Sequence, residues 1–107
     1  MVSSKELYVG RSEDFELNRA VSVIVDGVRV LIVRTPTRLF ALADACPHQS
    51  RSLELGTVEG DTIRCAFHRV SVALDSGDVV DDAGHYGLEK VQTFGVSERD
   101  GEVHVTF

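Results

Sequence analysis

The chain has 107 residues, of which 43% are hydrophobic and 26% charged, a composition that suits one globular domain and excludes a disordered chain. Eleven basic residues against 17 acidic ones give a net charge of −6, which argues against nucleic acid as a partner. No segment approaches the roughly 18 consecutive apolar residues of a membrane span, and the first residues carry no targeting signal, so we expect a soluble cytoplasmic protein.

The first half of the chain has an apolar pattern with a period of two, which predicts antiparallel β structure. Leu7–Val9 is expected to form the first strand, and residues 12–18 at most one helical turn. Residues 20–25 and 28–34 flank Asp26-Gly27. This pair predicts a type I′ hairpin, because glycine accepts the positive φ that such a turn requires.

The second half repeats this design near the C-terminus. Residues 38–43 form a further predicted strand that leads into a polar segment. Residues 94–99 and 102–107 then flank Asp100-Gly101, which predicts a second hairpin of the same type. Both ends of the chain are therefore expected to be β structure, with the middle of the chain inserted between them.

That middle contains both cysteines of the chain, in two short segments separated by 16 residues. The segments are Cys46-Pro47-His48 and Cys65-Ala66-Phe67-His68, and each offers one thiol and one imidazole. A thiolate is a soft ligand and an imidazole a borderline one, so this set suits zinc or an iron–sulfur cluster. The candidate metal ligands are Cys46, His48, Cys65 and His68.

The order of ligand types favours one of these metals. Zinc fingers usually pair cysteine with cysteine and histidine with histidine, whereas each pair here is mixed. Mixed pairs suit two metal ions, with each segment giving its cysteine to one iron and its histidine to the other. The product is a [2Fe–2S] core in which two histidines replace two cysteines on one iron. A lone zinc site stays an alternative.

With these four residues the sequence resembles the Rieske family, whose signature is C-x-H, a spacer of the length seen here, and C-x-x-H. The resemblance includes the Leu, Gly, Gly, Ile rhythm of residues 53–64 and the turn-like Leu74-Asp75-Ser76-Gly77 after the second segment. It covers nearly the whole chain. It implies one Rieske-type [2Fe–2S] cluster per chain, held by the four candidate ligands.

The resemblance also implies the fold class: an all-β, Rieske-like antiparallel β-sandwich or barrel with an inserted cluster-binding subdomain. We expect one domain over residues 1–107. Its base subdomain would comprise about 1–43 and 81–107, and its cluster-binding subdomain about 44–80. Two rigid loops at the tip of the second subdomain would carry the cluster.

The implied role is that of a carrier and not an enzyme. The chain leaves no room for a separate catalytic domain, and outside the ligand set it has no phosphate-cradling glycine loop and no Ser-His-Asp set. A monomeric Rieske ferredoxin would take single electrons from a flavoprotein ferredoxin reductase and pass them to a terminal Rieske oxygenase. By resemblance, that oxygenase is an aromatic-ring hydroxylating dioxygenase of aromatic hydrocarbon catabolism, with a terminal monooxygenase of related design as an alternative. Two alternatives stay open: a small Rieske-like subunit of an assimilatory nitrite reductase, and a structural zinc-binding module.

Residues beside the ligands depart from the family pattern. Ser50 and Arg69 stand where family members usually have glycine. Val70 and Val72 replace a serine and a tyrosine that donate hydrogen bonds to the cluster in high-potential members. Because such bonds raise the potential, we expect a value of about −150 mV, at the low end of the Rieske range. Arg69 is either a solvated loop charge or a positive charge that stabilises the reduced state.

Two histidines remain outside the ligand set. His85 lies in residues 81–85, which take the place of the family's Gly-Pro-Ala loop near the cluster. A lone histidine in a polar loop is expected to be exposed; the alternative is that His85 lies near enough to cover the cluster. His104 has alternating apolar neighbours and is expected to be structural.

Overall fold

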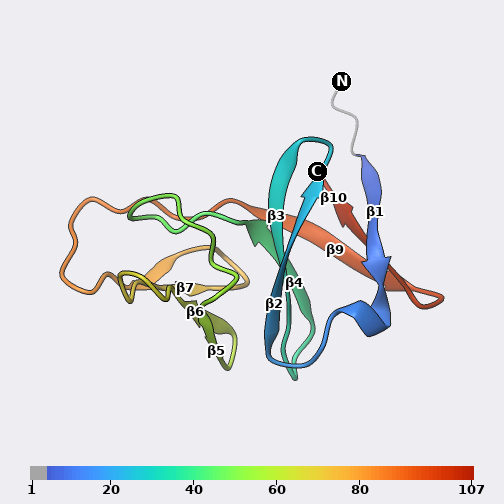
Figure 1. Cartoon of the computed structure of the whole chain (residues 1–107), viewed down its shortest axis with the longest axis horizontal. Helices are drawn as coiled ribbons and strands as arrows, with labels where there is room; N and C mark the ends of the chain where they lie inside the picture. The colour runs from blue at the N-terminus through green and yellow to red at the C-terminus, as the bar shows by residue number, and fades with distance from the viewer. Residues whose placement is uncertain (1–4) are drawn as a thin grey trace.

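The computed structural model describes residues 5–107, and these form a nearly all-β chain, as predicted (Figure 1). The described elements are β1 (Glu6–Arg11), the short 3₁₀ helix η1 (Ser12–Asp14), β2 (Arg19–Val25), β3 (Val28–Arg34), β4 (Leu39–Ala43), β5 (Thr57–Glu59), β6 (Thr62–Arg64), β7 (Ser71–Ala73), β8 (Val79–Asp81), β9 (Thr93–Arg99) and β10 (Glu102–Thr106). Within this part of the chain, no helix is long and apolar enough to cross a bilayer. Residues 1–4 of the predicted base subdomain lie outside the described residues.

The larger sheet joins the two ends of the chain. Its strand order is β1-β10-β9-β4-β3-β2, and all its neighbours are antiparallel. The two halves meet through the short β4–β9 ladder, where Ala41 pairs with Phe94 and Leu42 with Thr93. The sheet curls, so that β1 also approaches β2. Strands that are more than 50 positions apart in the sequence therefore share one sheet.

Both predicted hairpins have the turn geometry that their sequences require. Between β2 and β3, Asp26 has φ of 53° and Gly27 of 78°. Between β9 and β10, Asp100 has φ of 53° and Gly101 of 77°. Two successive positive φ values define the type I′ turn, whose twist matches that of the flanking strands. The two Asp-Gly pairs therefore fix the register of four of the six strands.

The strand β3 is buried on both faces. Val30 and Ile32 point into a core inside the larger sheet, while Leu31 and Val33 point into a second core that contains both cysteines. Successive side chains of a strand point to opposite faces, so one strand can serve two cores at once. This arrangement explains why the strand is apolar almost throughout, and it ties the larger sheet directly to the candidate metal site.

The smaller sheet is an antiparallel meander in the order β5-β6-β7-β8, on the left of Figure 1. Asp61, in the turn between β5 and β6, makes one polar contact with the larger sheet and one within the smaller sheet. The buried hydroxyl of Thr35, in the turn between β3 and β4, donates to the Asp61 carboxylate at 2.7 Å. The Asp61 carbonyl accepts a hydrogen bond from the Leu74 amide at 2.9 Å. The division into a base and a cluster-binding subdomain stays a prediction.

Gly77 closes the turn between β7 and β8 and makes close contact with the segment that returns to β9. Its φ is 78°, and its carbonyl accepts a hydrogen bond from the Val91 amide at 2.8 Å. A Cβ at this position would lie 1.8 Å from the Val91 carbonyl oxygen. Gly77→Ala should therefore lower the free energy of unfolding by about 3 kcal/mol, measured by thermal unfolding.

Gly27→Ala is the matched control for this substitution. Gly27 also has φ of 78°, but a Cβ added at this residue would meet nothing within 4 Å, so only the backbone strain of about 1–2 kcal/mol applies. Equal losses of stability in the two variants would contradict the steric argument at Gly77.

Candidate metal centre

The two segments that contain the candidate ligands form loops with the same backbone hydrogen bonds. We call residues 46–51 loop 1 and residues 65–70 loop 2. In each loop the backbone amide of the cysteine donates a hydrogen bond to the carbonyl oxygen five residues later. The cysteine carbonyl oxygen accepts a second one from the amide four residues later. The N···O distances of these bonds are 2.7 to 3.1 Å. The two thiols therefore start from equivalent, closed and rigid turns.

The same symmetry explains why glycine is common at two positions of the family pattern. Ser50 lies four residues after Cys46 and has φ of 56°, and Arg69 lies four residues after Cys65 and has φ of 59°. Side chains other than glycine, asparagine and aspartate rarely adopt this left-handed conformation, which costs about 1–2 kcal/mol. Serine and arginine therefore keep the loop shape in this chain at a cost in stability.

The two thiols are buried and lie within hydrogen-bonding reach of each other. Burial is the largest influence on Cys46 and raises the pKa of its thiol; the His48 backbone amide lowers this pKa, and the adjacent Cys65 raises it again. Two neighbouring thiolates in a buried place require a compensating positive charge. A metal ion supplies this charge and deprotonates its thiol ligands.

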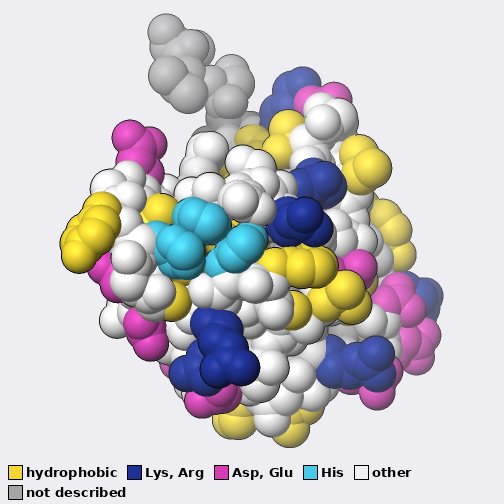
Figure 2. Space-filling view, turned by 60° about the vertical axis from the view of Figure 1, so that its left-hand side comes forward, with side chains coloured by type: hydrophobic (Ala, Val, Ile, Leu, Met, Phe, Trp, Pro, Cys, Tyr) yellow, Lys and Arg dark blue, Asp and Glu magenta, His cyan; other side chains and the backbone are white. Residues whose placement is uncertain are grey.

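The two candidate imidazoles lie together at the surface end of the loops (Figure 2). The ring centroids of His48 and His68 are 4.4 Å apart with an interplanar angle of 72°, and both side chains are half-buried. Burial, followed by the charges that His85 and His68 would carry, lowers the pKa of His48. A lower pKa favours the neutral imidazole, which is the form that binds metals.

The donor atoms fit a two-metal core better than a single ion. In a tetrahedral zinc site, with bonds of about 2.0–2.3 Å, neighbouring donor atoms would be only about 3.3–3.8 Å apart. Among residues 5–107, the groups of three donor atoms that lie within 4.8 Å of one another comprise histidines alone, without either thiol. The thiols and imidazoles therefore do not converge on one point, as Cys₂His₂ zinc would require.

One nitrogen of the site lacks a hydrogen-bond partner. The Nδ1 atom of His48 is buried and is unpaired within the described part of the chain. Buried polar atoms without a partner are rare, and a role in binding a metal ion is one of the physical explanations. The chemistry of the donor set, two inner thiols and two outer imidazoles, fits a [2Fe–2S] cluster with mixed ligands.

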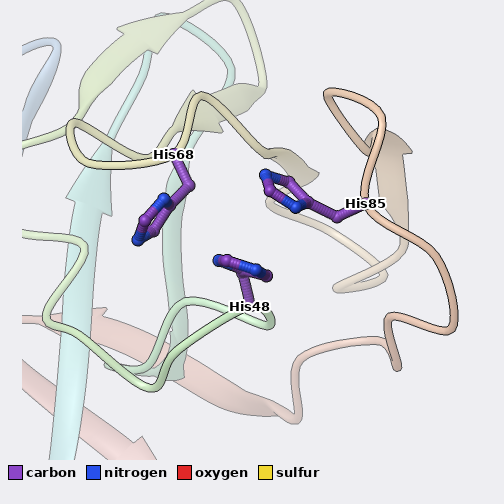
Figure 3. Close-up of side chains that lie close together, drawn as sticks. All are labelled: His48, His68 and His85. Atoms are coloured by element: carbon purple, nitrogen blue, oxygen red, sulfur yellow. The ribbon is translucent and has the colours of Figure 1, made fainter.

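His85 lies closer to these imidazoles than the sequence indicated. Its ring centroid is 3.8 Å from that of His48 with an interplanar angle of 31°, and 5.9 Å from that of His68 (Figure 3). A turn brings it there, in which Ala83 has φ of 52°, Gly84 has φ of 85° and the His85 amide donates to Asp82. The expectation of an exposed histidine is corrected: His85 is half-buried against His48.

Gln49 makes a contact with the site that the sequence did not indicate. Its side-chain oxygen lies 2.9 Å from Nε2 of His68, so a residue of loop 1 contacts a candidate ligand of loop 2. No residue spacing signals a contact between these two positions. Its place next to a ligand in the sequence was the only clue, and it did not specify which histidine the amide would reach.

Basic and hydrophobic side chains lie beside the histidines on this face (Figure 2). The Arg51 guanidinium lies 4.7 Å from the centroid of the Phe67 ring, which is 46% exposed and therefore only partly packed. Within residues 5–107, neither Arg51 nor Arg69 lies within 4 Å of a carboxylate. The two ligand loops therefore carry uncompensated positive charge on a chain with a net charge of −6.

The curated proteins that are similar to this chain differ greatly in length. The apoptosis-inducing factor 3 proteins of Homo sapiens and Mus musculus are 29% identical over 87 residues, which are 81% of this chain and 14% of each relative. This chain thus spans only a small part of those relatives. The ferredoxin CarAc of Metapseudomonas resinovorans is 30% identical over 81 residues, 76% of this chain and 73% of the relative.

Solved structures share the fold over almost the whole chain. The ferredoxin of carbazole 1,9a-dioxygenase from Nocardioides aromaticivorans IC177 matches with a TM-score of 0.84 at 19% identity, covering 94% of this chain and 96% of that one. A chain in the complex of reduced oxygenase and oxidized ferredoxin in carbazole 1,9a-dioxygenase matches with a TM-score of 0.82 at 27% identity. The match covers 94% of this chain and 91% of that one. A putative NADPH nitrite reductase small subunit matches with a TM-score of 0.79 at 19% identity, covering 94% of this chain and 97% of that one.

The family assignment follows from the match along the sequence itself. Residues 5–94 match the family described as the Rieske [2Fe-2S] domain, and this range includes both ligand loops and β1 to β8. The family implies one Rieske-type cluster for the chain, in agreement with the donor set at the ends of the loops. The chain belongs to the Rieske [2Fe–2S] domain family.

Proposed function

We propose that this protein is a one-electron carrier, a Rieske ferredoxin, that binds one [2Fe–2S] cluster through Cys46, His48, Cys65 and His68. Such a cluster, when bound, accepts and releases one electron and is neutral in its oxidised form. The two closed loops hold the thiols inside the core and the imidazoles at the surface. The residues thus expose the histidine side of the site to a partner and keep the cysteine side dry.

The separation of thiols from imidazoles is the observation that carries this proposal. Both cysteines are only 1% exposed, whereas both histidines are half-buried at the surface. No thiol joins the histidines in a three-donor group within 4.8 Å, among the described residues. A mononuclear zinc module needs all its donors around one point, so this geometry supports a cluster over zinc.

We further propose that the electron donor is a flavoprotein reductase and the acceptor a terminal oxygenase, of the aromatic-ring hydroxylating kind. The similarity to ferredoxin CarAc and to the ferredoxins of carbazole 1,9a-dioxygenase supports this role. A nitrite reductase small subunit is the second candidate, supported by likeness of fold alone at 19% identity. The presence of all four candidate ligands favours the carrier. The cytoplasmic location and the monomeric state stay predictions.

The cluster and the ligands can be tested on purified protein. Iron and acid-labile sulfide should each number two per chain. Electron paramagnetic resonance of the dithionite-reduced protein should show a rhombic signal of low average g, typical of mixed cysteine and histidine ligation. The potential should lie near −150 mV, because the buried Val70 and Val72 donate no hydrogen bonds. Zinc without sulfide would contradict the proposal, and a potential well above zero would contradict the predicted low potential.

The acceptor can be tested by turnover. The protein, reduced by an NADH-dependent flavoprotein reductase, should be reoxidised by a Rieske oxygenase only when an aromatic substrate is present. Nitrite with a nitrite reductase large subunit serves as the second arm of the experiment. Reoxidation in the nitrite arm alone would reject the oxygenase role and leave the one-electron carrier intact.

Arg69→Gly should change both the free energy of unfolding and the reduction potential. The control Ser50→Gly should change only the free energy of unfolding. Each substitution removes a strained left-handed residue at the same position of a ligand loop, so each should raise the free energy of unfolding by about 1 kcal/mol. Arg69→Gly alone removes a positive charge that favours the reduced state, so it alone should lower the potential and slow electron transfer. Voltammetry and thermal unfolding of both variants check this. An unchanged potential in Arg69→Gly would make Arg69 a solvated surface charge.

A further inference from the structure

Gln49 connects the two ligand loops through a side-chain hydrogen bond. It follows His48 directly in loop 1, yet its side chain reaches across to His68 of loop 2. The distance from Gln49 Oε1 to His68 Nε2 is 2.9 Å, which is an ordinary hydrogen-bond length. The contact spans 19 positions of sequence and is independent of the backbone bonds that close each loop.

This contact determines which nitrogen of His68 carries the proton. An amide oxygen has lone pairs and no hydrogen, so it can only accept. Nε2 of His68 must therefore be the donor, and in a neutral imidazole the other ring nitrogen, Nδ1, then carries the free lone pair. A metal ligand needs such a lone pair. Gln49 thus selects the tautomer in which Nδ1 can bind iron.

We propose that Gln49 is a positioning residue for His68, one that fixes the tautomer and the ring orientation of this ligand and tunes the potential of the site. The proposal rests on the function proposed above. His48 has a different environment, because its ring lies against His85 at 3.8 Å between centroids and its buried Nδ1 has no partner among the described residues. The two imidazoles of the site are therefore not equivalent in this chain.

The direction of the effect on the potential follows from the hydrogen bond. An acceptor on the outer N–H makes the imidazole a stronger donor to the metal. A stronger donor stabilises the ferric state more than the ferrous state and so lowers the potential. Removal of the acceptor should raise the potential, and a stronger, anionic acceptor should lower it. A residue that only supports the loop would not raise the potential in the first case and lower it in the second.

The experiment is a series at one position with matched controls at another. Gln49→Leu removes the acceptor and Gln49→Glu strengthens it, while Gln92→Leu and Gln92→Glu make the same changes at the chain's other glutamine, which is exposed on the segment before β9. All four are prepared as cluster-loaded proteins. Their potentials are measured by voltammetry, their cluster loss by the decay of visible absorbance, and their ligand nitrogens by pulsed electron paramagnetic resonance.

We expect Gln49→Leu to have a higher potential than the parent chain, and Gln49→Glu a lower one. A tenfold change in the oxidised-to-reduced ratio corresponds to a shift of about 59 mV in the potential. Gln49→Leu should also lose its cluster about tenfold faster, as is typical when an outer hydrogen bond to a ligand is removed. Only one of the two histidine nitrogen couplings should change in Gln49→Leu. The Gln92 variants should retain the parent's cluster lifetime and couplings.

Three results would overturn the positioning role: equal potentials in both Gln49 variants, shifts that match those of the Gln92 variants, or equal changes in both nitrogen couplings. A failure of the proposed function looks different. In that case the parent chain itself would carry no iron, no labile sulfide and no rhombic signal.

Discussion

His68→Ala should yield a protein without a [2Fe–2S] cluster, whereas His85→Ala should retain two irons and two labile sulfides per chain. The two residues differ in their predicted role although both imidazoles lie beside His48. His68 belongs to a loop that also contains a buried thiol, and its Nε2 lies 2.9 Å from Gln49 Oε1, which leaves Nδ1 as the proposed donor atom. Removal of this proposed ligand would leave one iron of the cluster with three donors. Iron and sulfide analysis and the visible spectrum measure the outcome.

His104→Ala is the control for this series, because His104 lies on β10, outside both ligand loops, against Tyr8. It should load its cluster like the parent chain. A cluster in His68→Ala and none in His85→Ala would transfer the ligand role to the third histidine. That result would contradict the assignment from the C-x-H and C-x-x-H pairs.

Asp44→Ala should destabilise the protein by about 3–5 kcal/mol. The Asp44 side chain is completely buried just before loop 1 and accepts three hydrogen bonds: from Ser22 Oγ at 2.6 Å, from Ser52 Oγ at 2.7 Å and from the Leu53 amide at 2.7 Å. The Arg29 Nε lies 3.6 Å from its carboxylate. Alanine would leave these donors without their acceptor in a place that water does not reach.

Thermal unfolding of the cluster-loaded protein, followed by far-ultraviolet circular dichroism, measures this effect. A loss of about 3 kcal/mol corresponds to a decrease of at least about 12 °C in Tm for a domain of this size. Asp75→Ala is the control, because Asp75 is exposed and accepts no side-chain hydrogen bond among the described residues. Similar Tm values for the two variants would show that the Asp44 network contributes little.

Five of the six strands of the larger sheet could be predicted from the sequence to within one residue at each end, whereas the strand predicted at 7–9 covers only half of β1. A period of two is clear in β10, while β3 is a nearly continuous apolar run. Asp26-Gly27 and Asp100-Gly101 mark the turns at the positions where the structure has positive φ pairs. The strand predicted at 28–34 coincides with β3, and that predicted at 20–25 is one residue shorter than β2. Long alternating runs with a defined turn leave few alternatives.

The smaller sheet could not be predicted in the same detail. Each of its strands, β5 to β8, has three residues, which is too short for a period to be recognised. Their position beside the larger sheet depends on contacts such as the one between Thr35 and Asp61, which joins positions 26 residues apart. The Gly77 position was recognised only through family resemblance; its physical reason, the close approach of Val91, is visible in the structure alone.

The candidate ligands were accessible to sequence reasoning because their chemistry and spacing are local. Cys46 with His48, and Cys65 with His68, each lie in one short loop. The contacts of His85 and Gln49 with the imidazoles are not local, since a turn after β8 and a side chain that crosses between loops produce them. Spacing can identify donors of this kind, but the neighbours that adjust them depend on how the loops pack.

The closed loops also bear on how fast the protein can exchange electrons. Each cysteine is fixed by two backbone hydrogen bonds of its own loop, and Asp44 anchors the continuation of loop 1 to β2. Gain or loss of one electron changes metal–ligand bond lengths only slightly, and a framework held in this way has little freedom to respond further. For the proposed carrier, the nuclear reorganisation that accompanies electron transfer should therefore be small, so that encounter with a partner, and not rearrangement of the protein, would limit the rate.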